Sequence, residues 1–73
     1  KHEEALECLD KVIELDPKNA DAWYNKGNHF LELGKHEEAL KCFDKAFELD
    51  PKDSLACHNK GIALAKLDKH EEK

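Results

Sequence analysis

Apolar residues recur every three or four positions in four stretches of the chain, which is the spacing of an amphipathic helix. In the first stretch, 3–15, this pattern places Leu6, Leu9 and Ile13 on one face. The same spacing predicts further helices over 20–33, 37–49 and 54–67. The pattern therefore predicts an all-α fold of four helices.

The residues between these stretches are of the types that begin and end helices. Pro17 and Pro51 disfavour helical geometry at the residue before each of them, so the first and third helices are expected to stop there. Asn19 and Asp53 are expected to cap the second and fourth helices with their side-chain oxygens. Gly34 suits the left-handed conformation that often follows a helix, and it is expected to end the second one.

The sequence repeats with a period of 34 residues. Placing residues 1–34 over 35–68 gives 19 identities in 34 pairs, and Lys-His-Glu-Glu returns a third time at 69–72. Asp68 stands where Gly34 stood, and it is expected to adopt the same left-handed geometry at a higher energetic cost. We call the helix over 20–33 and its counterpart A, and the helix over 37–49 and its counterpart B. The expected organisation is one array: a B helix of a partial repeat over 1–19, a complete repeat over 20–53, and an A helix of a partial repeat plus a stub over 54–73.

A 34-residue helix-turn-helix period resembles the tetratricopeptide repeat (TPR), whose pattern is W-x2-L-G-x2-Y, then A-x3-F, then P. The chain offers, in phase with this pattern, Trp23, Gly27, Phe30, Ala39, Phe43 and Pro51. It departs from the pattern at Lys26 and Lys60, which replace Leu, and at Cys57, which replaces Trp. A lysine can lay its methylene stem along the helix pair and keep its ammonium in water. Gly27 and Gly61 are expected to let helices A and B approach closely.

The resemblance implies a right-handed solenoid of antiparallel helix pairs and a non-catalytic role in protein–protein interaction. In that family the A helices line a concave groove that binds peptides or partner domains. On this chain the groove positions, spaced three or four apart, are Asp21, Tyr24, Asn25, Asn28 and Glu32 in the first A helix and Leu55, His58, Asn59, Ile62 and Lys66 in the second. Asn25 and Asn59 are identical, and their amides suit either a peptide main chain or hydrogen bonds between helices.

The two units differ mainly in their A halves. Residues 1–18 and 35–52 share 14 of 18 positions, whereas 19–34 and 53–68 share 5 of 16. Such a pattern fits a binding groove whose A helices differ between the units while the B helices stay the same. It also fits simple drift of exposed faces after duplication, and the sequence leaves both interpretations open.

The amino-acid composition bears on the class of partner and on the cellular compartment. The net charge is −5, with twelve Lys and no Arg, so a nucleic-acid partner is disfavoured and an RNA-binding helical repeat is a weaker alternative. No apolar run approaches the roughly twenty residues that span a bilayer, so a membrane is not expected either. The three Cys indicate free thiols in a reducing cytoplasm. No Met is present, so the sequence is expected to be a piece of a longer chain.

Metal binding and catalysis are not expected, and neither is a cofactor. Cys8 and Cys42 lie one period apart, as do His2, His36 and His70, so duplication explains their spacing better than coordination does. Cys57 and His58 are adjacent, which points them to different sides of a helix, and no third orienting group for nucleophilic catalysis is visible.

Both ends of the array are expected to leave apolar side chains without a neighbouring helix. Solenoid repeats bury such faces against the next unit. The uncovered residues would be Leu6, Leu9 and Ile13 on the first helix and Ile62, Leu64 and Leu67 on the last. Head-to-tail self-association would cover both sets, and the alternative is a marginally stable monomer.

Overall fold

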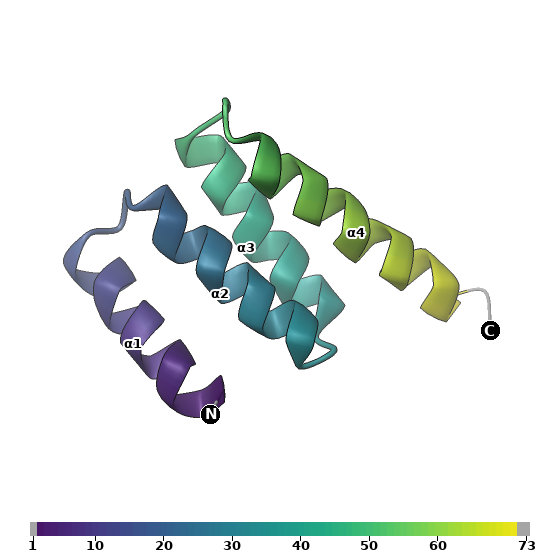
Figure 1. The fold of residues 1–73 in the computed structure, drawn as a ribbon, viewed down its shortest axis with the longest axis horizontal. Helices are drawn as coiled ribbons and strands as arrows, with labels where there is room; N and C mark the ends of the chain where they lie inside the picture. Colours follow the sequence, from purple (N-terminus) through teal and green to yellow (C-terminus); the bar gives the residue numbers. More distant parts are fainter. Residues whose placement is uncertain (1, 72–73) are drawn as a thin grey trace.

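The structure, a computed structural model, describes the backbone of residues 2–71 and the side chains of residues 4–68. It contains four α-helices in the order α1 (His2–Leu15), α2 (Ala20–Glu32), α3 (His36–Leu49) and α4 (Ser54–Glu71). Each helix turns back to run beside the one before it (Figure 1). The all-α prediction is confirmed, and the first three helices begin and end within one residue of the predicted positions.

α4 is longer than expected because Asp68 does not turn the chain. α2 ends at Glu32, and the φ of 81° at Gly34 that follows lets the Lys35 N–H reach the Phe30 carbonyl at 2.9 Å. Among the described residues no residue other than glycine has a positive φ, so the left-handed geometry expected for Asp68 is wrong. A Cβ makes that geometry costly, and the chain continues in right-handed helix to Glu71 instead. The first residues of the stub, which were expected to follow the last helix, therefore extend α4 to Glu71.

The predicted helix caps are confirmed. Asn19 Oδ1 accepts the N–H of Ala22 at 3.1 Å. Asp53 Oδ1 accepts the N–H groups of Leu55 and Ala56 at 3.0 and 3.2 Å. These bonds satisfy N–H groups that the first turn of each A helix otherwise leaves without a helical partner.

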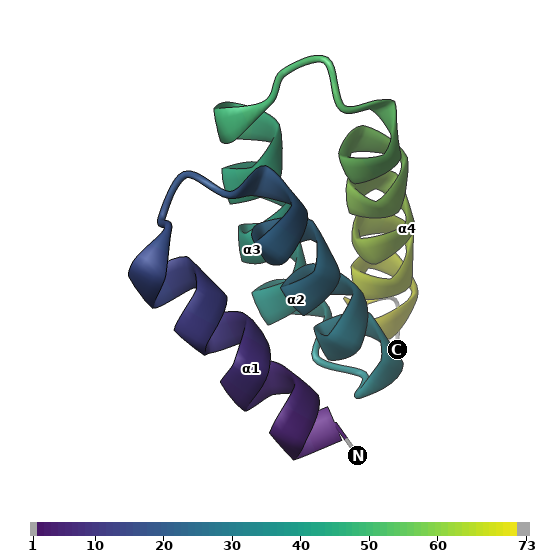
Figure 2. The ribbon, with the colours of Figure 1, turned by 60° about the vertical axis from the view of Figure 1, so that its left-hand side comes forward.

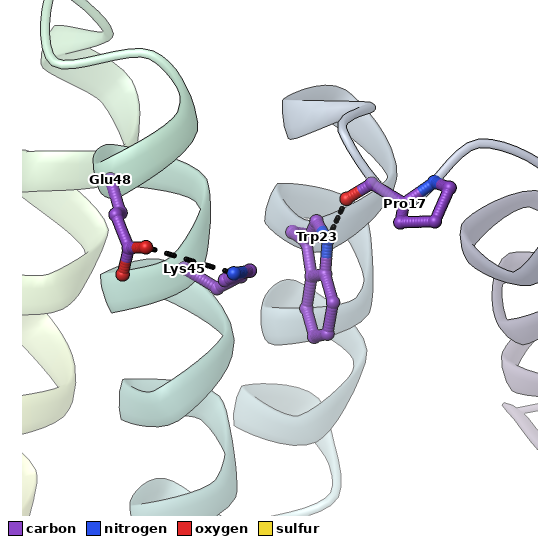
Figure 3. Close-up of polar contacts among 4 residues, drawn as sticks. All are labelled: Pro17, Trp23, Lys45 and Glu48. Carbon is purple, nitrogen blue, oxygen red and sulfur yellow. Dashed lines mark hydrogen bonds and ion pairs between the residues drawn. The ribbon is translucent and has the colours of Figure 1, made fainter.

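The α1–α2 loop has an additional tie. Trp23 Nε1 donates to the Pro17 carbonyl at 3.1 Å, so the indole of α2 holds the loop that precedes it (Figure 3). Cys57 occupies the same position on α4 and has no such N–H group. In the α3–α4 loop, Asp50 Oδ1 instead accepts the N–H of Lys52 at 3.3 Å.

The core lies between α2, α3 and α4. Phe43 of α3 is fully buried, and the buried residues beside it, Ala39 and Ala63, are small. Gly27 of α2 makes this packing possible, because a Cβ at that position would lie 2.6 Å from Phe43 Cε1. The expected close approach at Gly27 is therefore confirmed. At Gly61 it is wrong, because a Cβ there would meet nothing within 4 Å.

Burial falls from the middle of the chain toward its ends. Among the described residues, α3 contacts both α2 and α4, whereas α1 contacts only α2. Figure 2 shows α1 and α4 on opposite sides of the α2–α3 pair. Cys42 and Ala46 of α3 are accordingly buried, and their counterparts on α1, Cys8 and Val12, are exposed. The neighbouring helix, more than the residue type, sets how much of each side chain is buried.

Candidate binding site on helices α2 and α4

A cluster of three polar side chains joins the two A helices. Asn59 of α4 donates from Nδ2 to Asn28 Oδ1 at 2.7 Å and to the Tyr24 hydroxyl at 3.0 Å. Tyr24 and Asn28 lie four residues apart on α2, so they share one face of that helix. All three side chains are half-buried. We call this group the Tyr24–Asn28–Asn59 cluster.

The cluster keeps hydrogen-bonding capacity that its internal bonds do not use. Asn59 donates both amide hydrogens, which leaves its Oδ1 as an acceptor. Asn28 accepts through Oδ1, which leaves its NH2 group as a donor. The Tyr24 hydroxyl accepts from Asn59 and still has its own hydrogen to donate. The cluster therefore offers two donor groups and one acceptor at the junction of α2 and α4.

Asn25 has the same repeat position as Asn59 and a different environment. It is exposed, and none of the described hydrogen bonds between helices involves it. The counterparts of Tyr24 and Asn28 on α4 are His58, which is exposed, and Ile62, which is half-buried. Of the two interpretations of these asparagines, hydrogen bonding between helices is thus observed for Asn59.

The other predicted groove positions differ between the two helices. On α2, Asp21 and Glu32 are exposed carboxylates. On α4, Leu55 is 61% exposed and Lys66 is also exposed. The face is therefore acidic on α2 and mixed apolar and basic on α4. The structure links three of the ten predicted positions by hydrogen bonds.

Two ion pairs that the sequence analysis did not anticipate tie each A helix to the B helix before it. Lys26 Nζ lies 2.6 Å from Asp10 Oδ1, and Lys60 Nζ lies 2.6 Å from Asp44 Oδ1. The hydrogen bond that the Lys60 ammonium donates to the Asp44 carboxylate, together with the negative charge of Asp44, raises the pKa of Lys60 above its ordinary value. Both members of the pair recur one period later, and that coincidence is the signal that could have revealed them.

Lys26 also covers aromatic surface. Its ammonium lies 5.7 Å from the centroid of the Trp23 ring and 5.9 Å from that of Phe30, within the range of a cation–π contact. The side chain is only 21% exposed. The Lys26 ammonium was expected to remain in water. It is instead paired with Asp10 at the edge of the α1–α2 interface.

The apolar residues expected to be incompletely covered at the two ends are half-buried or exposed. Leu6, Leu9 and Ile13 of α1 are half-buried, as are Ile62 and Leu67 of α4, and Leu64 is 44% exposed. Leu67 also lines a shallow depression beside the α2–α3 turn, with Gly34 and residues 35–38. That depression does not include the Tyr24–Asn28–Asn59 cluster.

The described residues bring together no group of three His, Cys, Asp or Glu side chains that could hold a metal ion. Cys8, Cys42 and Cys57 are free thiols, and burial raises the pKa of the Cys42 thiol, which disfavours the reactive thiolate. Within the described part of the chain, no helix is long and apolar enough to cross a membrane.

Comparisons with known proteins agree with the repeat architecture. A family profile described as Tetratricopeptide repeat matches residues 20–53, and a second, described as TPR repeat, matches residues 1–32. Among curated proteins, none matches the chain. The two profiles together span helices α1 to α3, whose antiparallel packing, small core residues and Gly27–Phe43 contact are described above. The chain belongs to the tetratricopeptide repeat family.

Proposed function

We propose that the face formed by α2 and α4 binds an extended peptide or a partner domain, and that the protein is a non-catalytic interaction scaffold. TPR repeats generally mediate protein–protein interaction. The observation that supports a site at this place is the Tyr24–Asn28–Asn59 cluster. Its hydrogen bonds hold two A helices in register while its remaining donors and acceptor stay available at the surface.

The chemistry of the face favours a peptide main chain as the anchoring group. A main chain offers a carbonyl acceptor and an N–H donor per residue, which complements the Asn28 NH2 group and Asn59 Oδ1. Leu55 and Ile62 would contact an apolar side chain of the ligand. Asp21 and Glu32 would favour a basic residue nearby, because carboxylates attract cations at short range.

Titration of the 15N-labelled chain with separate acidic, basic and apolar peptides, followed by amide NMR shifts, tests this proposal. We expect shifts in α2 and α4 that include the side-chain amides of Asn28 and Asn59, with the basic–apolar peptides binding most tightly. Tyr24→Phe removes the free hydroxyl donor and should weaken binding about tenfold, as expected for loss of one hydrogen bond.

Glu48→Gln is the matched control, because Glu48 is an exposed residue of helix α3 rather than of an A helix. It should bind as the unmodified chain does. Shifts confined to α1 and α3, or equal affinity for Tyr24→Phe and the unmodified chain, would contradict the proposed face.

Self-association is a second candidate function, and one observation favours it. Gly27 is covered by Phe43, whereas its counterpart Gly61 faces open space. Among the described residues, the contact between Gly27 and Phe43 therefore has no counterpart at Gly61. We propose that a second copy supplies that contact.

Net charge and the state of the cysteines bear on the class of partner and on the cellular location. With no Arg and a net charge of −5, protein is favoured over nucleic acid as the partner. All three cysteines are free thiols, which suits a reducing compartment, and we place the protein in the cytoplasm.

A further inference from the structure

We infer that the α2–α4 face selects a peptide with one basic and one acidic residue. The basic residue lies against Glu32 of α2, and the acidic residue lies against Lys66 of α4. This selection rests on the peptide-binding function proposed above and names the charges of the ligand. Both residues lie on helices that contact each other within the described chain, so their relative placement is independent of any further repeat.

Glu32 and Lys66 share their helix faces with the Tyr24–Asn28–Asn59 cluster. Glu32 follows Asn28 at i+4 on α2, and Lys66 follows Asn59 at i+7 on α4. The 2.7 Å hydrogen bond between Asn59 and Asn28 joins these two faces. Because α2 and α4 run in the same direction (Figure 1), both charges lie on the C-terminal side of the cluster, one on each helix.

Both charges are exposed and available to a ligand. Lys60, also on α4, is held by Asp44, whereas among the described residues no ion pair involves Glu32 or Lys66. Glu32 also lies in the last turn of α2, where the helix dipole disfavours a carboxylate, so helix stability does not account for it. A cation bound at Glu32 would offset that unfavourable interaction.

Glu32 and Lys66 occupy the same repeat position with opposite charge. Between the two aligned units, charge changes sign at one other position, which is Glu7 on α1 and Lys41 on α3. Glu7 and Lys41 belong to the B helices, and the cluster does not join those helices. The A helices therefore present opposite charges on neighbouring helices of one face, and the B helices provide a matched pair of charges outside it.

The spacing of the two helices limits how far apart the ligand charges lie. Helices in contact have axes about 8–10 Å apart. An extended peptide advances about 3.3 Å per residue, and its side chains alternate between two faces. Charged residues placed two or four positions apart therefore share one face of the peptide and bracket the distance between α2 and α4. With a spacing of four, the residue midway between the charges points to the same face and would contact Ile62, which is half-buried.

The net charge of the chain favours a different ligand. At −5, the protein as a whole attracts a doubly basic peptide most strongly. Recognition by Glu32 and Lys66 instead makes a mixed-charge peptide the tightest ligand. The order of affinities thus separates recognition at this face from attraction by the whole protein.

NMR titration of the 15N-labelled chain with four capped apolar peptides tests this selection. At the same two positions the peptides carry Lys then Glu, Glu then Lys, two Lys, or two Glu, and each set is made with spacings of two and four. We expect the tighter mixed-charge peptide to bind about fivefold more tightly than either like-charged peptide at low ionic strength, as for an exposed ion pair. This preference should disappear at about 1 M salt, where the Debye length is about 3 Å.

Reversing each charge should switch the preferred peptide. Glu32→Lys should favour the doubly acidic peptide, and Lys66→Glu should favour the doubly basic one, each by about fivefold over the mixed-charge peptides. Combining the two substitutions should restore the preference for mixed charge. The matched control combines Glu7→Lys with Lys41→Glu, which makes the same changes at exposed positions of the B helices. It should bind all four peptides as the unmodified chain does.

The possible failures are distinguishable. Absence of binding by every peptide, or shifts confined to α1 and α3, would overturn both the proposed function and the charge assignment. Binding at the α2–α4 face with the doubly basic peptide tightest would overturn the charge assignment alone, as would an unchanged preference in Glu32→Lys or Lys66→Glu. Circular dichroism of each variant confirms that a changed preference does not reflect unfolding.

Discussion

Identical residues one period apart behave differently in this chain because different helices surround them. Cys42 is buried where Cys8 is exposed, and Asn59 forms two hydrogen bonds between helices where Asn25 is exposed. Residue type is the same in each comparison, so the difference comes from the neighbouring helix. The same substitution at two positions one period apart therefore measures the effect of the neighbouring helix.

Asn59→Ala and Asn25→Ala should differ in stability for this reason. Both replace the same residue inside a helix, so the gain in helix propensity is shared. Only Asn59→Ala removes the two bonds to α2, which should lower the free energy of unfolding by about 1–3 kcal/mol relative to Asn25→Ala. Urea denaturation of the two variants measures this difference. Equal stability would mean that the Tyr24–Asn28–Asn59 cluster does not stabilise the α2–α4 contact.

At the scale of the element, the two A helices end differently because of one residue. Gly34 adopts a left-handed conformation and allows the chain to turn into α3. Asp68, at the same position of the next unit, continues α4 as a right-handed helix. The same repeat position is therefore a helix stop in one unit and a helix interior position in the other.

Substitution by alanine should consequently have opposite effects at these two positions. Gly34→Ala forces a Cβ into left-handed geometry and should cost about 1–2 kcal/mol of stability. Asp68→Ala should instead add about 0.5 kcal/mol, because alanine has the higher helix propensity and a carboxylate is unfavourable near a helix C-terminus. Thermal denaturation at matched concentration distinguishes the signs. A destabilised Asp68→Ala chain would argue against a continuous α4.

The helices could be predicted from sequence because apolar spacing, proline stops and side-chain caps are local signals. Asn19, Asp53 and Gly34 each act through bonds or dihedral angles within a few residues of themselves. The left-handed geometry predicted for Asp68 is wrong because the repeat position alone does not fix the backbone, and only glycine adopts that geometry at low cost. The chain therefore turns at Gly34 because the residue is glycine, and not because of its position in the repeat.

Contacts between helices were harder to predict than the helices themselves. The open space at Gly61 depends on whether a further helix lies beside α4, which the local sequence does not encode. The pairing of Lys26 with Asp10 requires knowing which faces of α1 and α2 meet. For the same reason, the ten groove positions could be assigned to a face, whereas the bonds among Tyr24, Asn28 and Asn59 could not.

At the scale of the whole molecule, the chain is a row of helices in which each contacts its sequence neighbours, with one further contact between α2 and α4. α3 lies between two A helices and carries the fully buried Phe43. In the part of the chain that the structure describes, α1 contacts only α2, partly through the Lys26–Asp10 ion pair. Stability in such an array is close to a sum over neighbouring interfaces, so it should be lowest where a helix has one neighbour.

Amide hydrogen exchange should reveal this gradient. We expect α1 amides to exchange faster than their α3 counterparts, residue by residue along the two B helices, because α1 can detach while the α2–α3–α4 core persists. Residues 5–15 and 39–49 are the segments to compare. Equal protection in both would indicate that the array unfolds as a single cooperative unit.

The indole bond to Pro17 has a consequence for spectroscopy. Trp23 is the single tryptophan of the chain, and its Nε1–H is fixed to the loop that joins α1 to α2. Its emission therefore senses the attachment of the first hairpin, while far-ultraviolet dichroism averages over all four helices. Thermal unfolding followed by tryptophan fluorescence therefore reports on the α1–α2 loop alone. If its midpoint agrees with that from far-ultraviolet dichroism, the four helices unfold cooperatively.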